Sequence, residues 1–120
     1  MKKILLVDDH SDIRQLMRLT LGKTYEILEA DDGVSALAVT QNKRPDLVIL
    51  DIMMPGPLDG YMVLERIRAD PELRGTRVIM VTARGQAKDY DAGMSRGADA
   101  YFIKPFSPMQ LTQKIREFLP

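Results

Sequence analysis

The chain has 120 residues, of which 45% are hydrophobic and 28% charged, values typical of one globular domain over residues 1–120 with no membrane-embedded segment. Seventeen basic residues balance seventeen acidic ones, so no global basic field exists to attract nucleic acid, and we expect no direct nucleic-acid binding by this chain. The absence of cysteine excludes disulfides and thiolate metal sites, which fits a cytoplasmic location.

Short apolar runs predict four buried strands along the chain. They cover residues 4–7, 47–50, 78–81 and 100–103, and amphipathic segments separate them. This alternation predicts an α/β fold with a parallel sheet whose buried strands are covered by helices on both faces. Residues 25–29 include polar side chains, so we expect a fifth strand exposed at an edge.

Apolar residues spaced three and four apart predict helices between the strands. Gly22 is placed to end the first helix, and the residue before Pro71 should end the third, because it resists helical geometry. The apolar faces of the first three helices carry, in chain order, Ile13, Leu16, Met17 and Leu21; Val34, Leu37 and Ala38; and Val63, Leu64 and Ile67.

The fourth helix, near residues 87–96, is predicted to be weak and the most mobile element. Gly93 interrupts it, Gly97 ends it, and its apolar stripe is thin. The last helix should begin at the N-cap Ser107 and the first-turn residue Pro108. Its apolar face carries Leu111, Ile115 and Phe118.

Polar side chains follow each of the four buried runs. Asp8 and Asp9 follow the first, Asp51 the second, Thr82 the third and Lys104 the fourth. Because the carboxyl ends of parallel strands meet at one edge of a sheet, we expect these five side chains to converge there. The convergence favours a functional site over the ordinary explanations for each residue alone, which are turns, helix caps, strand packing or solvated charge.

The predicted cluster requires a cation. Two ionised carboxylates at ~4 Å and an effective dielectric of ~20 repel by about 4 kcal/mol, and Lys104 supplies only one positive charge. The hard oxygen donors indicate Mg²⁺, and we expect the only histidine, His10, to be exposed and not a ligand. In such a site Asp51 can attack phosphorus to form an aspartyl phosphate, with Lys104 and the Thr82 hydroxyl contacting the phosphoryl oxygens.

These residues resemble the receiver domains of two-component response regulators, chemotaxis regulators among them. The resemblance covers essentially the whole chain. It depends on Asp8-Asp9, LDIMMP around Asp51, Asp59-Gly60, VTA at 81–83 and GADAYFIKPF at 97–106. It implies a flavodoxin-like, doubly wound (βα)5 fold, a three-layer sandwich whose five parallel strands lie in the order 2-1-3-4-5.

The resemblance also implies a role for individual residues. Asp51 would be the phospho-acceptor and would share in binding Mg²⁺. Asp9 would bind the metal directly and Asp8 mainly through water, and the Met53 backbone carbonyl would be a further ligand.

Other residues match the family's conformational switch. Thr82 would be the switch hydroxyl, Lys104 the phosphate-binding lysine and Tyr101 the aromatic switch residue. The peptide between Lys104 and Pro105 would be cis.

The function implied is that of a phosphorylation switch. The domain would take its phosphoryl group from a phosphohistidine of a sensor kinase or phosphotransfer protein, which docks near the first helix and residues 105–107. It would catalyse that transfer itself and slowly hydrolyse the product. Its fourth helix, fifth strand and last helix would then control a protein target or an attached output domain, as a monomer or as a weak dimer through the fourth and fifth helices.

Three alternatives are considered. A phosphohydrolase of the dehalogenase type would carry a second acid where this chain has Met53, and a flavodoxin-like mononucleotide binder would need Gly/Ser/Thr-rich loops after its strands. A receiver-like docking module that is never phosphorylated is the third.

The chain also departs from the family pattern, because Gly56-Pro57-Leu58 is one residue longer than usual, and we expect Pro57 to stiffen a bulged loop.

Overall fold

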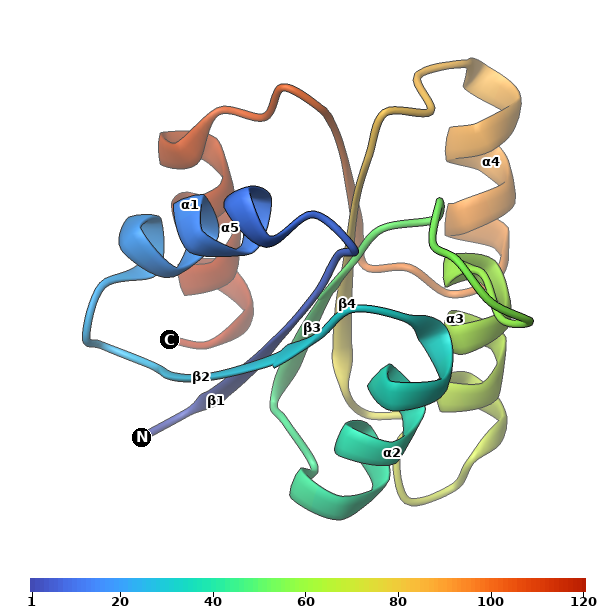
Figure 1. Cartoon of the computed structure of the whole chain (residues 1–120), viewed down its shortest axis with the longest axis horizontal. Coiled ribbons are helices and arrows are strands. Elements are labelled where there is room, and N and C mark those ends of the chain that lie inside the picture. Colours follow the sequence, from blue (N-terminus) through green and yellow to red (C-terminus); the bar gives the residue numbers. More distant parts are fainter.

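The computed structural model describes residues 1–120. Strands and helices alternate along the chain, and the strands form one parallel sheet in the order β2-β1-β3-β4-β5 (Figure 1). The predicted fold class and strand order are therefore confirmed. The strands are β1 (Lys3–Val7), β2 (Glu26–Ala30), β3 (Leu47–Leu50), β4 (Arg77–Thr82) and β5 (Ala100–Ile103).

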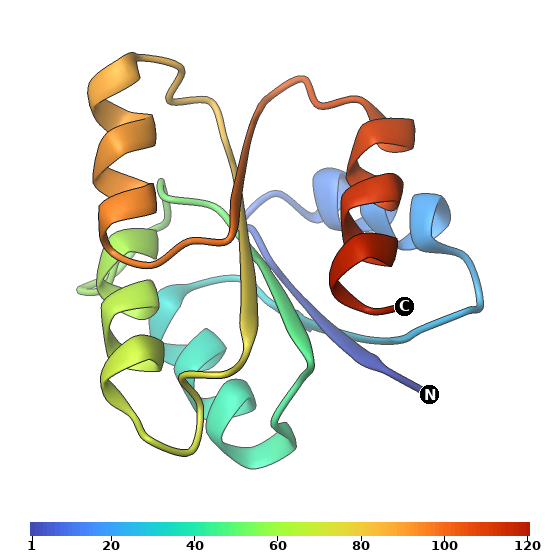
Figure 2. The ribbon, with the colours of Figure 1, turned by 180° about the vertical axis from the view of Figure 1, so that it is seen from behind.

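Helices cover both faces of the sheet, which gives three layers. Figures 1 and 2 show α1 and α5 on one face and α2, α3 and α4 on the other. The helices are α1 (Ser11–Leu21), α2 (Gly33–Lys43), α3 (Gly60–Ala69), α4 (Ala87–Ser95) and α5 (Pro108–Phe118). None of them has the length and apolarity that a bilayer crossing requires.

The continuous apolar runs arise because the inner strands have no solvent face. In β3, Leu47 and Ile49 pack in the cluster under α1 and α5, whereas Val48 and Leu50 pack in the cluster under α2 and α3. Successive side chains of a strand point to opposite faces, so both sets must be apolar. Because β3 is buried on both faces up to Leu50, the next residue, Asp51, lies at the end of a buried strand.

Three details of the predicted burial are wrong. On α1, Leu16 lies outside the buried face and is 44% exposed. The run 100–103 is not covered on both faces, because β5 is an edge strand that pairs only with β4 and leaves Ile103 50% exposed. On α2, Val34 and Ala38 face outward, and the buried face carries Ala36, Leu37 and Thr40. The polar Thr40 can be buried because its hydroxyl donates to the Ala36 carbonyl at 2.7 Å.

The predicted helix boundaries are confirmed where the sequence carried a capping signal. Gly22, with φ 66°, follows α1, and Asp70 ends α3. The side chains of Asp59 and Ser107 accept bonds from the backbone N–H groups of the first turns of α3 and α5. The cap of α2 by Asp32 was not predicted. Greater mobility of α4 stays a prediction.

Candidate functional site

The sheet register brings four strand ends together. Val7 of β1 lies opposite Leu50 of β3, so the next residues, Asp8 and Asp51, are neighbours at the carboxyl end of the sheet. Thr82 is the last residue of the adjacent strand β4. Asp8, Asp51 and Thr82 are only 1%, 3% and 0% exposed, so these polar groups lie inside the protein at the base of the site.

Lys104 bridges the two buried carboxylates. Its Nζ donates to Asp8 Oδ2 at 2.6 Å and to Asp51 Oδ2 at 2.8 Å. Burial opposes charge on this amine, but the hydrogen bonds to Asp51 and Asp8 outweigh it and raise the pKa of Lys104. The lysine is thus held charged, yet one positive charge faces two buried carboxylates, so the site stays electronegative.

The second oxygen of each buried carboxylate accepts a backbone bond. Asp51 Oδ1 accepts from Met53 N at 3.1 Å, and Asp8 Oδ1 accepts from His10 N at 2.9 Å. These bonds fold the chain sharply after β1 and β3. Arg14 Nη1 donates to the Asp8 backbone carbonyl at 2.6 Å and supports the first of these turns.

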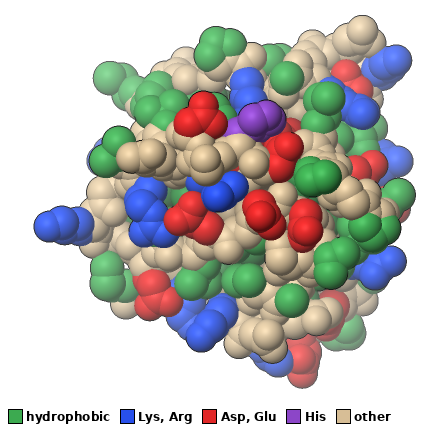
Figure 3. All heavy atoms as spheres, in the orientation of Figure 1, with side chains coloured by type: hydrophobic (Ala, Val, Ile, Leu, Met, Phe, Trp, Pro, Cys, Tyr) green, Lys and Arg blue, Asp and Glu red, His purple; other side chains and the backbone are tan.

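Asp9 and His10 lie at the rim of the site. His10 Nδ1 lies 3.1 Å from Asp8 Oδ1 and 3.1 Å from Asp9 Oδ1, and the donor atoms of the three residues all lie within 4.8 Å of one another. Histidine and acidic side chains meet on the surface shown in Figure 3. His10 is exposed, as predicted, but its ring faces the carboxylates. It is also the N-cap residue of α1, so neither Asp8 nor Asp9 caps that helix.

A pocket of about 300 Å³ leads to Asp51. It is lined by His10, Asp12, Ile13, Asp51, Met53, Ala83 and Lys104. The pocket gives a small anionic group access to Asp51 although that carboxylate is buried. Met53 is 52% exposed beside it.

The residues of the site fit a divalent cation. Two buried carboxylates share one lysine, and a third, from Asp9, lies at the rim. Such a set of hard oxygen donors with excess negative charge is the chemistry that Mg²⁺ prefers. Asp51 is linked to Asp8 through Lys104 and is not part of the tight group formed by Asp8, Asp9 and His10.

Gly60 explains the Asp59-Gly60 pair. A Cβ at this position would lie 2.2 Å from the Asp51 carbonyl oxygen and 2.6 Å from the Ile52 Cα. Only glycine lets the first residue of α3 approach the end of β3 so closely, and its N–H donates to the Ile52 carbonyl at 2.9 Å. The start of α3 is thereby held against the end of β3.

Comparison with known proteins identifies the family. The family model for the response regulator receiver domain matches residues 4–116. The chain belongs to this family. A receiver domain is part of two-component signal transduction, and the coarse function predicted from the sequence is confirmed.

The receiver domain is similar to regulators of known sequence and structure. It is 44% identical over 119 residues to a probable transcriptional regulator, ycf27, of Cyanophora paradoxa, covering 98% of this chain and 48% of that protein. It is 41% identical over 118 residues to the transcriptional regulatory protein ResD of Bacillus subtilis, again covering 98% and 48%. The chain spans about half the length of these curated relatives.

A solved structure agrees with the fold. The putative response regulator from Chloroflexus aurantiacus superimposes with a TM-score of 0.92 at 34% identity, covering 98% of this chain and 97% of that one.

In this receiver domain, Tyr101 connects the end of β4 to α4. Its hydroxyl donates to the Arg84 carbonyl at 2.7 Å, two residues after Thr82. Its ring meets Tyr90 edge-on, with centroids 5.6 Å apart, and burial raises the pKa of Tyr101 to about 12. A Cβ on Gly93 would lie 3.2 Å from the ring, so the glycine that weakens α4 also makes room for Tyr101.

The loop that is longer than the family pattern packs against α2. Gly56 has φ 90°, and a Cβ on Gly33 would lie 2.4 Å from the Leu58 carbonyl oxygen. No local pattern predicts this contact, because Gly33 and Leu58 are distant along the chain. The Lys104–Pro105 peptide is cis, as the resemblance implied.

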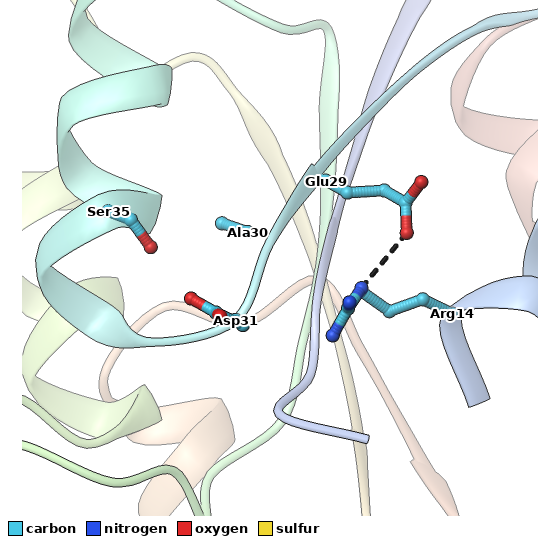
Figure 4. Close-up of a pocket in the computed structure, with 5 residues that line it drawn as sticks. All are labelled: Arg14, Glu29, Ala30, Asp31 and Ser35. Atoms are coloured by element: carbon cyan, nitrogen blue, oxygen red, sulfur yellow. Dashed lines mark hydrogen bonds and ion pairs between the residues drawn. The ribbon is translucent and has the colours of Figure 1, made fainter. Parts of the chain in front are cut away.

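A second pocket, of about 270 Å³, lies beside the site and is lined by Arg14, Glu29, Ala30, Asp31 and Ser35 (Figure 4). Arg14 Nε donates to Glu29 Oε1 at 2.9 Å, the dashed line in Figure 4. Arg18 donates to the other carboxylate oxygen, and hydrogen bonds from Arg18 and Arg14 hold the pKa of Glu29 below its ordinary value. This ion-pair network ties α1 to the edge strand β2.

Proposed function

We propose that Asp51 accepts a phosphoryl group from a phosphohistidine of a sensor kinase or of a histidine phosphotransfer protein. The observation that carries the proposal is the position of Asp51. Its carboxylate is 3% exposed, bonded to Lys104 at 2.8 Å, and reached through a pocket at the end of the sheet. A nucleophile held in this way attacks from a fixed direction.

The transfer is a simple displacement. A carboxylate oxygen of Asp51 forms a bond to phosphorus while the bond from phosphorus to the donor imidazole breaks, and the imidazole nitrogen takes the electron pair. Lys104 offsets charge on the phosphoryl oxygens, and the Thr82 hydroxyl donates to one of them. In the slow hydrolysis of the product, water that enters through the same pocket forms a bond to phosphorus while the bond from phosphorus to the Asp51 oxygen breaks, which releases inorganic phosphate and restores the carboxylate. The domain thus catalyses both its own phosphorylation and its dephosphorylation.

Mg²⁺ is part of the proposal. Asp8, Asp9, Asp51 and the Met53 backbone carbonyl would hold it, with Asp8 acting mainly through water. Bound there, the ion supplies positive charge that offsets the crowded carboxylates and the incoming phosphoryl group.

The proposed output is a change in the face formed by α4, β5 and α5. When the phosphoryl group draws Thr82 inward, the space it leaves admits the ring of Tyr101, which gives up its bond to Arg84. Tyr101 packs against Gly93 of α4, so its movement would alter the contacts of that helix. This is a shift between two packings, biased by new charge.

The partners follow from the same reasoning. The kinase or phosphotransfer protein would dock near α1 and residues 105–107. The target would be another protein or an attached output domain, as in relatives about twice as long that carry names of transcriptional regulators. This chain would not bind nucleic acid directly. We propose a cytoplasmic location and a monomer or a weak dimer through α4 and α5.

The test is the intact mass of the protein after incubation with Mg²⁺ and acetyl phosphate. Wild type should gain one phosphoryl group, and Asp51→Asn or a chelator should abolish the gain. Asp31→Asn is the matched control, because Asp31 directly follows β2 as Asp51 follows β3 but is exposed. If the folded wild type gains no mass, the proposal is wrong and the domain acts as a docking module.

A further inference from the structure

We propose that His10 is a metal ligand of this site, which shifts the preference of the site from Mg²⁺ toward transition metal ions such as Ni²⁺. The inference builds on the proposed function, because it concerns the cation held by the same carboxylates. It adds a nitrogen donor to a site that the resemblance describes through oxygen donors alone.

The spacing of the donor atoms supports three adjacent ligands. His10 Nδ1 lies 3.1 Å from an oxygen of Asp8 and 3.1 Å from an oxygen of Asp9. Neighbouring ligands of an octahedral ion with bonds of about 2.1 Å are about 3.0 Å apart. The imidazole nitrogen and the two carboxylate oxygens therefore have the separations that one ion requires, and an ion held by all three would contact Asp8 directly and not through water.

The backbone that carries the imidazole is also held in place. His10 N donates to Asp8 Oδ1 at 2.9 Å, and Arg14 holds the Asp8 carbonyl at 2.6 Å. The His10 ring is 62% exposed, yet its Nδ1 faces the carboxylates. Little conformational freedom remains to be lost when an ion binds, which favours binding.

Lys104 does not compete for this position. Its Nζ bonds to Asp8 Oδ2, whereas His10 faces Oδ1 of the same carboxylate. An ion on the Oδ1 side can thus be bound while Lys104 keeps its two bonds. The group also remains electronegative, because Asp9 adds a carboxylate that pairs with no lysine or arginine.

A nitrogen donor changes which ions are preferred. Imidazole suits Ni²⁺ and Zn²⁺, and affinity for sites with nitrogen donors rises from Mn²⁺ to Ni²⁺, whereas Mg²⁺ favours oxygen and keeps its waters. The rim position of His10 therefore predicts weaker discrimination in favour of Mg²⁺ than an all-oxygen set would give.

The first experiment is pulsed EPR on protein without an affinity tag, loaded with Mn²⁺. Because the chain has a single histidine, nitrogen coupling characteristic of a bound imidazole can be assigned to His10. We expect that coupling in wild type and its loss in His10→Gln. Absence of the coupling in Mn²⁺-loaded wild type would overturn the inference without any variant.

The second experiment compares affinities by calorimetry. In His10→Gln, the dissociation constant for Ni²⁺ should rise roughly tenfold or more, and that for Mg²⁺ by less than about threefold. His10→Asp, which restores a ligand but makes it an oxygen, should move the preference further toward Mg²⁺. Equal changes for Ni²⁺ and Mg²⁺ in His10→Gln would overturn the inference.

These outcomes are separable from the proposed function. Phosphorylation of Asp51 in Mg²⁺ without nitrogen coupling in Mn²⁺ would reject only the role of His10. Nitrogen coupling without any gain of a phosphoryl group would reject only the phosphotransfer proposal.

Discussion

Charged side chains are paired differently at the two ends of the sheet. At the amino end, Arg68 and Asp99 form an ion pair at 2.9 Å, and both are 21% exposed. Asp99 also accepts from Val78 N at 2.8 Å and pairs with Arg77 at 3.2 Å. The remaining donors of Arg68 bond to the backbone carbonyls of Arg74, Thr76 and Gly97.

At the carboxyl end, buried carboxylates outnumber their cationic partner. Asp8 and Asp51 are buried and share Lys104, and Asp9 adds a third carboxylate at the rim. The amino-end network satisfies its own groups and joins α3, β4 and β5. The carboxyl-end cluster retains excess negative charge that only a ligand can offset, which is the usual difference between a structural network and a functional site.

The largest effect should come from the closest backbone contact at the carboxyl end. Gly60→Ala should destabilise the domain by about 4 kcal/mol and reduce phosphoryl gain, because its Cβ would overlap the end of β3. Urea unfolding measures the change. Gly75→Ala at the other end is the control, since its Cβ would meet no atom within 4 Å. Equal stability of the two variants would contradict the account.

The amino-end network should be the next most sensitive to change. Arg68→Ala should lower the free energy of unfolding by about 3 kcal/mol, because Asp99 loses one of its two arginine partners and three backbone carbonyls lose their donor. Folded Arg68→Ala should still be phosphorylated. Arg66→Ala on the same helix is exposed and should change stability by about 0.5 kcal/mol or less. A similar loss in both variants would show that the network is unimportant.

An Asp→Asn substitution at each end of the sheet tests whether the two ends differ in this way. Asp99→Asn should cost about 2 kcal/mol, because two arginines lose a charged partner. Asp51→Asn should not destabilise the domain in the absence of metal, because Asp8 keeps Lys104 and the repulsion between the two carboxylates disappears. Chemical denaturation of both variants gives the values. If Asp51→Asn lowers the free energy of unfolding as much as Asp99→Asn does, the two ends do not differ in this way.

The smallest effect concerns Glu29, which is paired with Arg18 and Arg14. Glu29→Gln should cost about 0.5 kcal/mol, since the carboxylate is partly exposed and screened by solvent. Its folded-state pKa is lowered from 4.5, so this stabilisation is present above pH 4.5 and is lost as the pH falls through the folded-state pKa.

Urea unfolding at a series of pH values checks this prediction. The difference between wild type and Glu29→Gln should be constant at neutral pH and should shrink in acid. Glu26→Gln on the same strand is exposed and serves as the control. If the stability difference between wild type and Glu29→Gln grows as the pH falls, the prediction is wrong.

The sequence was sufficient to predict the inner strands and most of the site. Each inner strand is buried on both faces, so its apolar run is unbroken, and the polar residue that ends the run marks the carboxyl end of the sheet. Asp8, Asp51 and Lys104 could be predicted to meet for that reason, and the structure brings them into contact.

Other features depend on tertiary packing that local patterns do not encode. The run of β5 has the same composition as a covered strand, although it lies at an edge. Arg68 and Asp99 are charged residues 31 positions apart, and nothing in their neighbourhoods indicates a pair. His10 was predicted not to be a ligand because the oxygen donors sufficed, but the turn after β1 directs its ring toward them.

Asp51 should be the one phospho-acceptor at the carboxyl end of the sheet. The most direct measurement is peptide mapping by mass spectrometry after borohydride reduction of protein treated with acetyl phosphate and Mg²⁺, because the reduction converts an aspartyl phosphate to homoserine. If Asp51 is the one acceptor, homoserine forms at position 51 alone. Homoserine at Asp8, Asp9 or Asp59, or a gain of phosphoryl mass with no homoserine, would contradict it.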